Sequence, residues 1–165
     1  INDKYKYQIL RFLLMASLNF VSIVDVPLEH LIKILTDYEK FPNYLPRQLK
    51  TIKIIESHNG TITTEDTIVF SSIVKNTIHQ QSIHQQISPN EISSKIISGP
   101  AKETIINLYL KENGTKTEIN INIDLKLSLK AKFLEPIIKL WYKRVITGVL
   151  FTISNEFIQQ QSDQI

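Results

Sequence analysis

Apolar and polar residues alternate strictly along TEININIDLKLSLK, the segment at 117–130. Isoleucine or leucine fills the odd positions from 119 to 129, and asparagine, aspartate, lysine or serine fills the even ones. Successive side chains of a strand point to opposite faces, so this pattern predicts a strand with one buried face and one solvated face. Because the strand is long, we expect its sheet to curve around another element.

The hydrophobic period changes to that of a helix after Pro136, and the pattern predicts a helix of about six turns. With residues spaced by ~100°, one side of this helix carries the sole tryptophan, Trp141, and several apolar or small residues. We expect that side to face the sheet; it comprises Leu134, Ile137, Ile138, Trp141, Val145, Gly148, Val149 and Thr152.

The first half of the chain begins with a predicted strand at 17–25 and a predicted helix at 27–38, with Pro27 near the first helical position. The run DYEKFPNYLP at 37–46 follows, and its two prolines limit it to short turns. Its aromatic residues recur at helical spacing and would share one face. We expect this run, called the plug below, to lie on an apolar surface.

The remaining segments read as strands at 48–57, 61–74, 78–88, 91–98 and 103–112. Asn-Gly pairs at 59–60 and 113–114 separate strand-like runs, which predicts tight hairpins because glycine and asparagine tolerate positive φ. Both sites also fit the N-x-T glycosylation pattern, and turn chemistry is the favoured interpretation. Pro89-Asn90 and Gly99-Pro100 mark two further turns.

This order of elements predicts one α+β domain, a curved antiparallel sheet of about seven strands wrapped around a long C-terminal helix. We place the domain at 17–160, with an N-terminal extension at 1–16 and a frayed tail at 161–165. Met15 as a natural start and an ordinary N-terminal helix or strand remain alternatives for the extension. The chain has 165 residues, enough for a hydrophobic core.

The composition gives little positive evidence for catalysis, and we expect neither a metal nor a cofactor. The chain has no cysteine, and its four histidines show no metal-ligand spacing. Glu65 and Asp66 are adjacent, so on a strand they point apart and do not form a carboxylate pair. An enzyme that needs only a shaped cavity with one general acid or base is not excluded.

Six basic residues against one acid gather within 126–144, in a chain whose formal net charge is only +3. A solvated basic face is the simplest interpretation. The alternative is salt-sensitive contact with an acidic membrane surface or a ribosome, without sequence-specific nucleic-acid binding. The residues concerned are Lys126, Lys130, Lys132, Lys139, Lys143 and Arg144.

A family resemblance is carried by VPLEHLIKILTDYEKFPNYLP at 26–46, the turn Ser98-Gly99-Pro100 and DLKLSLKAKFLEP at 124–136. These segments resemble the START-like helix-grip (SRPBCC) superfamily of polyketide cyclases and lipid-transfer proteins. Within it they are most similar to the branch of coenzyme-Q-binding and ribosome-association toxin proteins.

The resemblance implies a cytoplasmic protein that binds or transports a lipid-like or isoprenoid/quinone-like molecule between the sheet and the C-terminal helix. A ribosome- or RNA-associated regulator and a cyclase or dehydratase are the alternatives. The plug would then be a lid over the cavity, or a static hydrophobic plug.

The polar strand HQQSIHQQI at 79–87 must point one alternate set of residues at this cavity. We choose the set with Ile83 because it buries two isoleucines; the other set contains Gln80, Ser82 and His84. We expect a modest cavity, with Gly148 either in its wall or at a close helix–sheet contact. The predicted cavity residues are Tyr38, Phe41, Tyr44, Leu45, Phe70, His79, Gln81, Ile83, Gln85, Leu108, Ile121, Ile123, Leu125, Trp141, Val145 and Gly148.

Overall fold

The computed structural model describes residues 15–71, 75–127 and 129–163, without the side chains of 71, 75–76 and 129–131. Its strands are β1 (Met15–Val24), β2 (Leu49–His58), β3 (Thr61–Ser71), β4 (Lys75–Ser88), β5 (Glu91–Ser98), β6 (Ile105–Asn113) and β7 (Lys116–Lys126). Its helices are α2 (Leu28–Leu35), α3 (Phe41–Tyr44) and α4 (Glu135–Ser162), with short 3-10 helices η1 (Tyr38–Lys40) and η2 (Leu129–Leu134).

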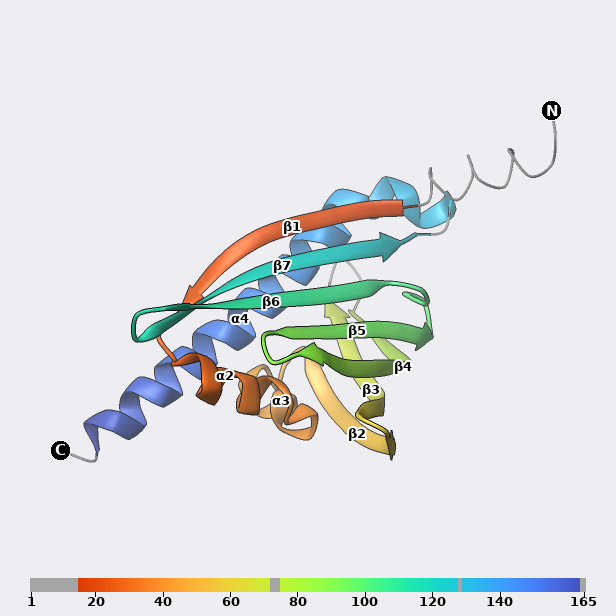
Figure 1. The fold of residues 1–165 in the computed structure, drawn as a ribbon. Helices are drawn as coiled ribbons and strands as arrows, with labels where there is room; N and C mark the ends of the chain where they lie inside the picture. The colour runs from red at the N-terminus through yellow and green to blue at the C-terminus, as the bar shows by residue number, and fades with distance from the viewer. Residues whose placement is uncertain (1–14, 72–74, 128, 164–165) are drawn as a thin grey trace.

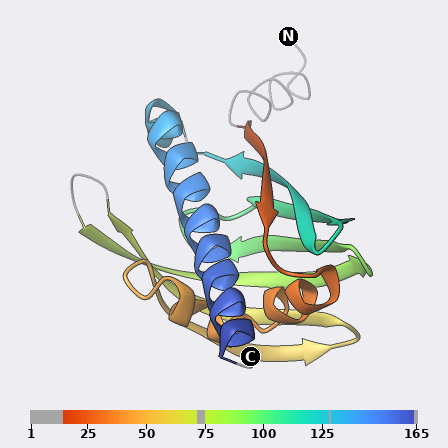
Figure 2. The same ribbon diagram turned by 90° about the vertical axis from the view of Figure 1, so that its left-hand side faces the viewer.

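All seven strands form one antiparallel sheet in the order β1-β7-β6-β5-β4-β3-β2 (Figure 1). The chain leaves β1 at one edge, passes through α2, η1 and α3, and enters β2 at the other edge. Consecutive hairpins then return it to β7, beside β1. Helix α4 crosses one face of this sheet (Figure 2). The predicted α+β helix-grip fold is therefore confirmed.

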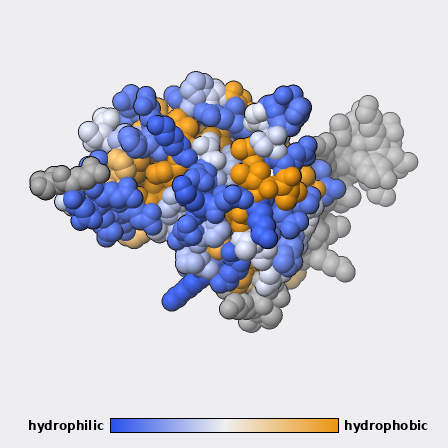
Figure 3. All heavy atoms as spheres, turned by 90° about the horizontal axis from the view of Figure 1, so that it is seen from below, coloured by the Kyte–Doolittle hydropathy of each residue, from blue (hydrophilic) through white to orange (hydrophobic). Residues whose placement is uncertain are grey.

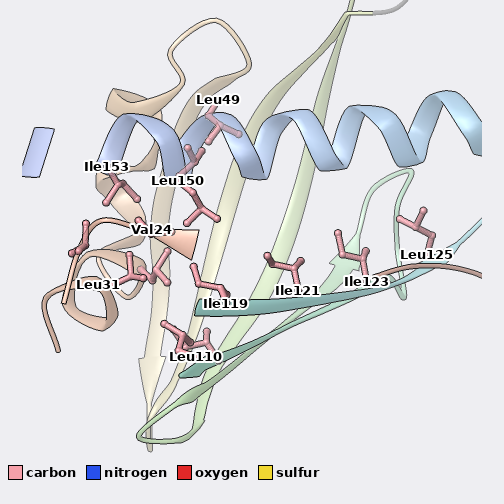
Figure 4. Close-up of a cluster of buried hydrophobic side chains, with 14 of the residues drawn as sticks. Val24, Leu31, Leu49, Leu110, Ile119, Ile121, Ile123, Leu125, Leu150 and Ile153 are labelled. Carbon is pink, nitrogen blue, oxygen red and sulfur yellow. The ribbon is translucent and has the colours of Figure 1, made fainter. Parts of the chain in front are cut away.

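Strand β7 buries the face that its alternation predicts. Ile119, Ile121 and Ile123 have no exposed surface, and Leu125 and Leu127 are also buried. Figure 4 shows Ile119, Ile121, Ile123 and Leu125 in a row along β7, on the side that faces α4. The strand ends at Lys126, so the prediction that it continues to residue 130 is wrong. The chain turns into η2 instead and enters α4.

The Asn59-Gly60 hairpin forms as predicted, with φ of 48° and 75° at its two central residues. In the β6–β7 hairpin Asn113 pairs with Lys116, so the turn residues are Gly114 and Thr115, one position later than the Asn-Gly signal. Gly114 alone of these two has a positive φ, of 62°. In both turns the glycine occupies the conformation that it adopts at little cost.

Helix α2 is shorter than the predicted 27–38 because Pro27 is its N-cap and Thr36 ends it. The carbonyl of Ile32 accepts both the Thr36 backbone N–H at 3.0 Å and the Thr36 hydroxyl at 2.9 Å, so Thr36 closes the last turn of the helix. The plug then forms as the two short helices η1 and α3. Asp25 is held to α4, because its backbone N–H donates to the Ser154 hydroxyl at 3.0 Å.

The first strand and the last helix extend beyond the bounds predicted from the sequence. Met15 and Ala16 are already part of β1, and the rest of the predicted extension lies outside the described residues. At the other end α4 continues to Ser162, into the segment 161–165 that the sequence suggested as a frayed tail.

Candidate functional site

A cavity of about 390 Å³ lies between the sheet and α4. Its walls are mainly aliphatic and aromatic side chains from β2 to β7 and from α4 as far as Leu150. Leu35, Tyr38 and Phe41 also contribute to its wall, from α2 and the plug. The plug therefore covers part of the apolar interior.

Polar side chains gather on one part of the cavity wall, where β3, β4 and β5 lie side by side. The strand registers make them neighbours, since Thr64 pairs with Ser82, Asp66 with Gln80, and His84 with Ser94. Five of the six line the cavity directly, and Thr64 lies fully buried next to them. We call this set the polar cluster: Thr64, Asp66, Gln80, Ser82, His84 and Ser94.

Asp66 lies at the centre of the polar cluster and is 5% exposed. Its Oδ1 accepts a hydrogen bond from the Thr64 hydroxyl at 2.7 Å. Its Oδ2 accepts from the Ser82 hydroxyl at 2.7 Å and from Gln80 Nε2 at 3.3 Å. Three donors from the protein thus compensate the burial of this carboxyl group, which unpaired would be costly.

The hydrogen bonds around His84 fit one arrangement of protons. The Thr64 hydroxyl directs its O–H at Asp66, so its oxygen accepts a hydrogen bond from His84 Nε2, 3.0 Å away. In a neutral imidazole the other nitrogen is then an acceptor, and His84 Nδ1 accepts from the Ser94 hydroxyl at 2.7 Å. In this arrangement each group donates to the next: Ser94 to His84, His84 to Thr64, and Thr64 to Asp66.

Burial favours the neutral form of His84. Desolvation lowers its pKa from the ordinary value of 6.5 to about 4, although the nearby Asp66 charge acts in the opposite direction. The Tyr38 ring stacks on the imidazole and is itself 4% exposed. Desolvation raises the Tyr38 pKa to about 12, and it also raises the pKa of Tyr142 on the facing helix. At neutral pH the imidazole is therefore uncharged and both phenols keep their protons.

The structure places seven of the predicted cavity residues in the cavity wall. They come from the plug, from β3, β6 and β7, and from α4. These residues are Tyr38, Phe41, Phe70, Leu108, Leu125, Trp141 and Val145.

Strand β4 directs into the cavity the alternate set of side chains opposite to the predicted one. Gln80, Ser82 and His84 line the cavity, whereas His79, Gln81, Ile83 and Gln85 point to the other face. Burial of Ile83 and Ile87 was the wrong criterion, since Ile87 is 55% exposed near the end of the strand. The inward polar groups satisfy one another across β3, β4 and β5, which removes most of the cost of their burial.

The remaining predicted residues belong to the packing around the cavity. Ile121 and Ile123 are buried in the core, outside the lining set. Tyr44 and Leu45 pack on the core from the plug. A Cβ on Gly148 would lie 3.2 Å from Leu45 Cδ1, so this glycine faces the plug and is not part of the cavity wall.

The inner face of α4 is rotated from the predicted one. Ile137 is 44% exposed, and Tyr142, Ile146 and Leu150 line the cavity instead. The predicted face is centred on Trp141, the largest side chain. In the structure Trp141 lies at one edge of the face that lines the cavity, where it packs against Phe70 at a centroid distance of 5.1 Å.

The basic residues are distributed over different surroundings. Glu135 forms ion pairs with Lys132 at 2.8 Å and Lys139 at 2.6 Å. Lys143 lies over the Phe20 ring, 5.6 Å from its centroid. Lys126 lines the cavity, and the side chain of Lys130 is outside those described. The lysines at 126, 132, 139 and 143 therefore do not form one free cationic surface.

The described ranges contain no group of three or more histidine, cysteine, aspartate or glutamate side chains that could hold a metal ion. No helix within those ranges is both long and apolar enough to cross a membrane.

On the face seen from below in Figure 1, apolar residues form separate patches among hydrophilic ones (Figure 3).

Solved structures similar to this chain share its fold. A START superfamily protein from Mycobacterium smegmatis is 14% identical, with a TM-score of 0.72, and the match covers 87% of this chain and 98% of that one. The Zhui aromatase/cyclase from Streptomyces sp. R1128 is 14% identical, with a TM-score of 0.69 and coverage of 86% and 93%. Ginseng major latex-like protein 151 from Panax ginseng is 13% identical, with a TM-score of 0.64 and coverage of 87% and 97%.

These likenesses extend along most of both chains, although the sequences have diverged widely. No protein-family model matches the sequence, and no curated protein matches it. At such low identity the similarity concerns the arrangement of the backbone. The chain has the START-like helix-grip fold.

Proposed function

We propose that this protein binds a hydrophobic or amphipathic small molecule, lipid-like or isoprenoid/quinone-like, in the cavity between the sheet and α4. The observation that carries the proposal is the combination of a 390 Å³ apolar cavity with one internally hydrogen-bonded polar cluster in its wall. Small-molecule sites commonly have this character, with apolar walls and a few placed polar groups.

The size of the cavity also supports this proposal. At about 24 cal/mol per Å³, a dry void of this volume would cost roughly 9 kcal/mol, a large share of the ~5–15 kcal/mol by which domains are stable. A cavity that is filled by water or by a ligand avoids most of that cost. An apolar ligand gains most from such walls, because its burial removes apolar surface from water.

The structural neighbours include a START superfamily protein and an aromatase/cyclase, and they are consistent with a ligand cavity in this fold. A second candidate function is therefore a cyclase or dehydratase. It is favoured by the position of Asp66 and His84, two titratable groups in the cavity wall. The hydrogen bonds that already occupy both groups favour binding as the primary role.

Trp141 provides a direct test, because it is the only tryptophan and lines the cavity. The apolar fluorophore N-phenyl-1-naphthylamine should bind saturably, with energy transfer from Trp141 to the probe. Native mass spectrometry of the purified protein should in addition detect a co-purified small molecule. Absence of both saturable binding and a co-purified molecule would refute the proposal.

Two phenylalanine substitutions on α4 provide a matched comparison. Val145→Phe fills part of the cavity and should weaken probe binding at least about tenfold, whereas Ile137→Phe enlarges an exposed side chain and should leave it unchanged. Equal effects of the two substitutions would place the probe outside the cavity.

A further inference from the structure

We infer that the polar cluster selects ligands whose polar end donates a hydrogen bond, such as an alcohol or an amine, over ligands that end in a carboxylate or another anion. This inference rests on the proposed function, because it specifies the chemistry of the molecule in the same cavity. It follows from the hydrogen bonds that the cluster has already formed and from the groups that remain available.

The carboxylate of Asp66 offers acceptors only. An ionised carboxylate has about four positions that accept hydrogen bonds, and three are occupied by Thr64, Ser82 and Gln80. Oδ2 receives two of these bonds and Oδ1 receives one, so Oδ1 retains capacity for one further donor. Asp66 lines the cavity, and a hydroxyl or amine of a ligand could supply that donor.

Most donors of the neighbouring side chains are already used. Gln80 Nε2 lies 3.3 Å from Asp66 Oδ2 and 3.4 Å from Ser82 Oγ; because these two oxygens are only 2.7 Å apart, they share one N–H of the amide, and the second N–H points elsewhere. Ser82 and Thr64 donate to Asp66, and Ser94 donates to His84. The oxygens of Gln80 and Ser94 retain acceptor capacity, since an amide carbonyl only accepts and a hydroxyl that has donated can still accept.

The charge of the cluster favours the same class of ligand. Three donors point at the two oxygens of Asp66, an arrangement that favours a carboxylate, and the neutral histidine supplies no compensating cation within the cluster. In a poorly hydrated cavity an anionic ligand group near this charge would be repelled more strongly than in water. The phenols of Tyr38 and Tyr142 can donate or accept, so they do not discriminate. Two other groups of the cavity wall could favour an anion or another acceptor instead: Lys126, and the indole N–H of Trp141, which is buried without a hydrogen-bond partner.

Three ligands with a decyl chain separate these possibilities on the unmodified protein. Decan-1-ol has a donor, decyl methyl ether keeps the oxygen but has no donor, and decanoate carries a negative charge. Each is titrated against bound N-phenyl-1-naphthylamine at pH 7. We expect decan-1-ol to displace the probe at about tenfold lower concentration than the other two, as for one hydrogen bond to a buried charged acceptor.

Two neighbouring carboxylates of β3 provide the variant and its control. Asp66→Asn removes the inward negative charge and introduces an amide N–H₂, so the advantage of decan-1-ol over decanoate should fall several-fold. Glu65→Gln makes the same change on the exposed opposite face and should preserve that advantage. Far-UV circular dichroism establishes whether Asp66→Asn is folded; the ligand series on the unmodified protein does not depend on it.

The outcomes distinguish this inference from the function on which it rests. Probe binding with equal displacement by all three ligands would overturn the donor preference and leave the binding function intact. Stronger displacement by decanoate would also overturn it and would direct attention to Lys126. A protein that binds neither the probe nor any decyl ligand would refute the binding function and the donor preference together.

Discussion

The ring of Tyr38 stacks on the imidazole of His84, with ring centroids 4.1 Å apart and 20° between the ring planes. Tyr38 is the first residue of η1 in the plug, and His84 belongs to β4, so this contact joins the plug to the polar cluster. Both residues line the cavity and also a second hollow beside Thr36 and Gly60. The pair therefore forms part of the partition between the cavity and that hollow.

The burial of His84 predicts a loss of stability in mild acid. The folded protein binds the His84 proton only near pH 4, whereas the unfolded chain binds it near 6.5. The contribution of the neutral imidazole is therefore fully present above pH 6.5 and is lost as the pH falls toward 4. Between these limits the free energy of unfolding should fall by about 3 kcal/mol through this group alone.

Urea unfolding at pH 7 and at pH 4 measures this contribution. In His84→Gln the difference between the two pH values should shrink by about 3 kcal/mol. His79→Gln, on the same strand but with an exposed side chain, should retain the full difference. An unchanged pH dependence in His84→Gln would show that other groups cause the acid sensitivity.

Removal of the Tyr38 ring should expose His84. Tyr38→Ala deletes a buried aromatic side chain and should lower the free energy of unfolding by about 3–5 kcal/mol. With less desolvation, the pKa of His84 should rise from about 4 toward 6.5, which NMR titration of the imidazole protons measures. Tyr38→Phe keeps the ring and should leave that pKa low; a low pKa in Tyr38→Ala would assign the burial of His84 to other residues.

Gly148 should tolerate alanine but not leucine. A Cβ at this position meets the flexible end of Leu45 at 3.2 Å, and the gain in helix propensity of ~1 kcal/mol offsets the small shift required. We expect Gly148→Ala to change stability by less than about 1 kcal/mol and Gly148→Leu to lower it by about 1–3 kcal/mol, because the larger side chain displaces Leu45. Urea unfolding measures both values.

Gly148→Ala also tests where Gly148 lies. Because Gly148 faces the plug, Gly148→Ala should bind N-phenyl-1-naphthylamine as well as the unmodified protein does. A loss of probe binding in Gly148→Ala without a loss of stability would indicate that Gly148 lines the cavity.

Contact between the basic residues at 126–144 and an acidic membrane surface or a ribosome stays a prediction. Hydrogen bonds from Lys132, with the larger effect, and from Lys139 lower the pKa of Glu135. The charges of these two lysines are therefore paired with Glu135 within the protein. Glu135→Gln should change stability by less than about 1 kcal/mol, as surface ion pairs usually do. It should strengthen co-sedimentation with anionic vesicles or ribosomes at low salt, because two lysines lose their partner.

Glu56→Gln removes the same charge from an exposed position on β2 and serves as the control. Equal co-sedimentation of the two variants would indicate an effect of net charge alone. No salt-sensitive co-sedimentation in either variant would exclude this use of the basic residues.

Local pattern in the sequence was sufficient for the order of elements and for much of the core. The alternation in β7 predicted which side chains are buried, because a strand has one fixed geometric period. Asn59-Gly60 predicted a hairpin, because few other residue pairs adopt positive φ at both turn positions. The proline-limited aromatic run predicted a plug, and Tyr38 and Phe41 do line the cavity.

The site itself depended on tertiary structure. Strand β4 has apolar and polar residues in both alternate sets, so its own sequence did not fix which set points inward. The inward set was decided by partners on β3 and β5, where Asp66, Thr64 and Ser94 satisfy Gln80, Ser82 and His84. The rotation of α4 was likewise decided by contacts, as Trp141 packs against Phe70 at the flank and Gly148 lies against Leu45. The periodic alternation of side chains along a strand or helix is a local property. The hydrogen bonds of a buried polar group, in contrast, require partner residues that only the folded chain brings together.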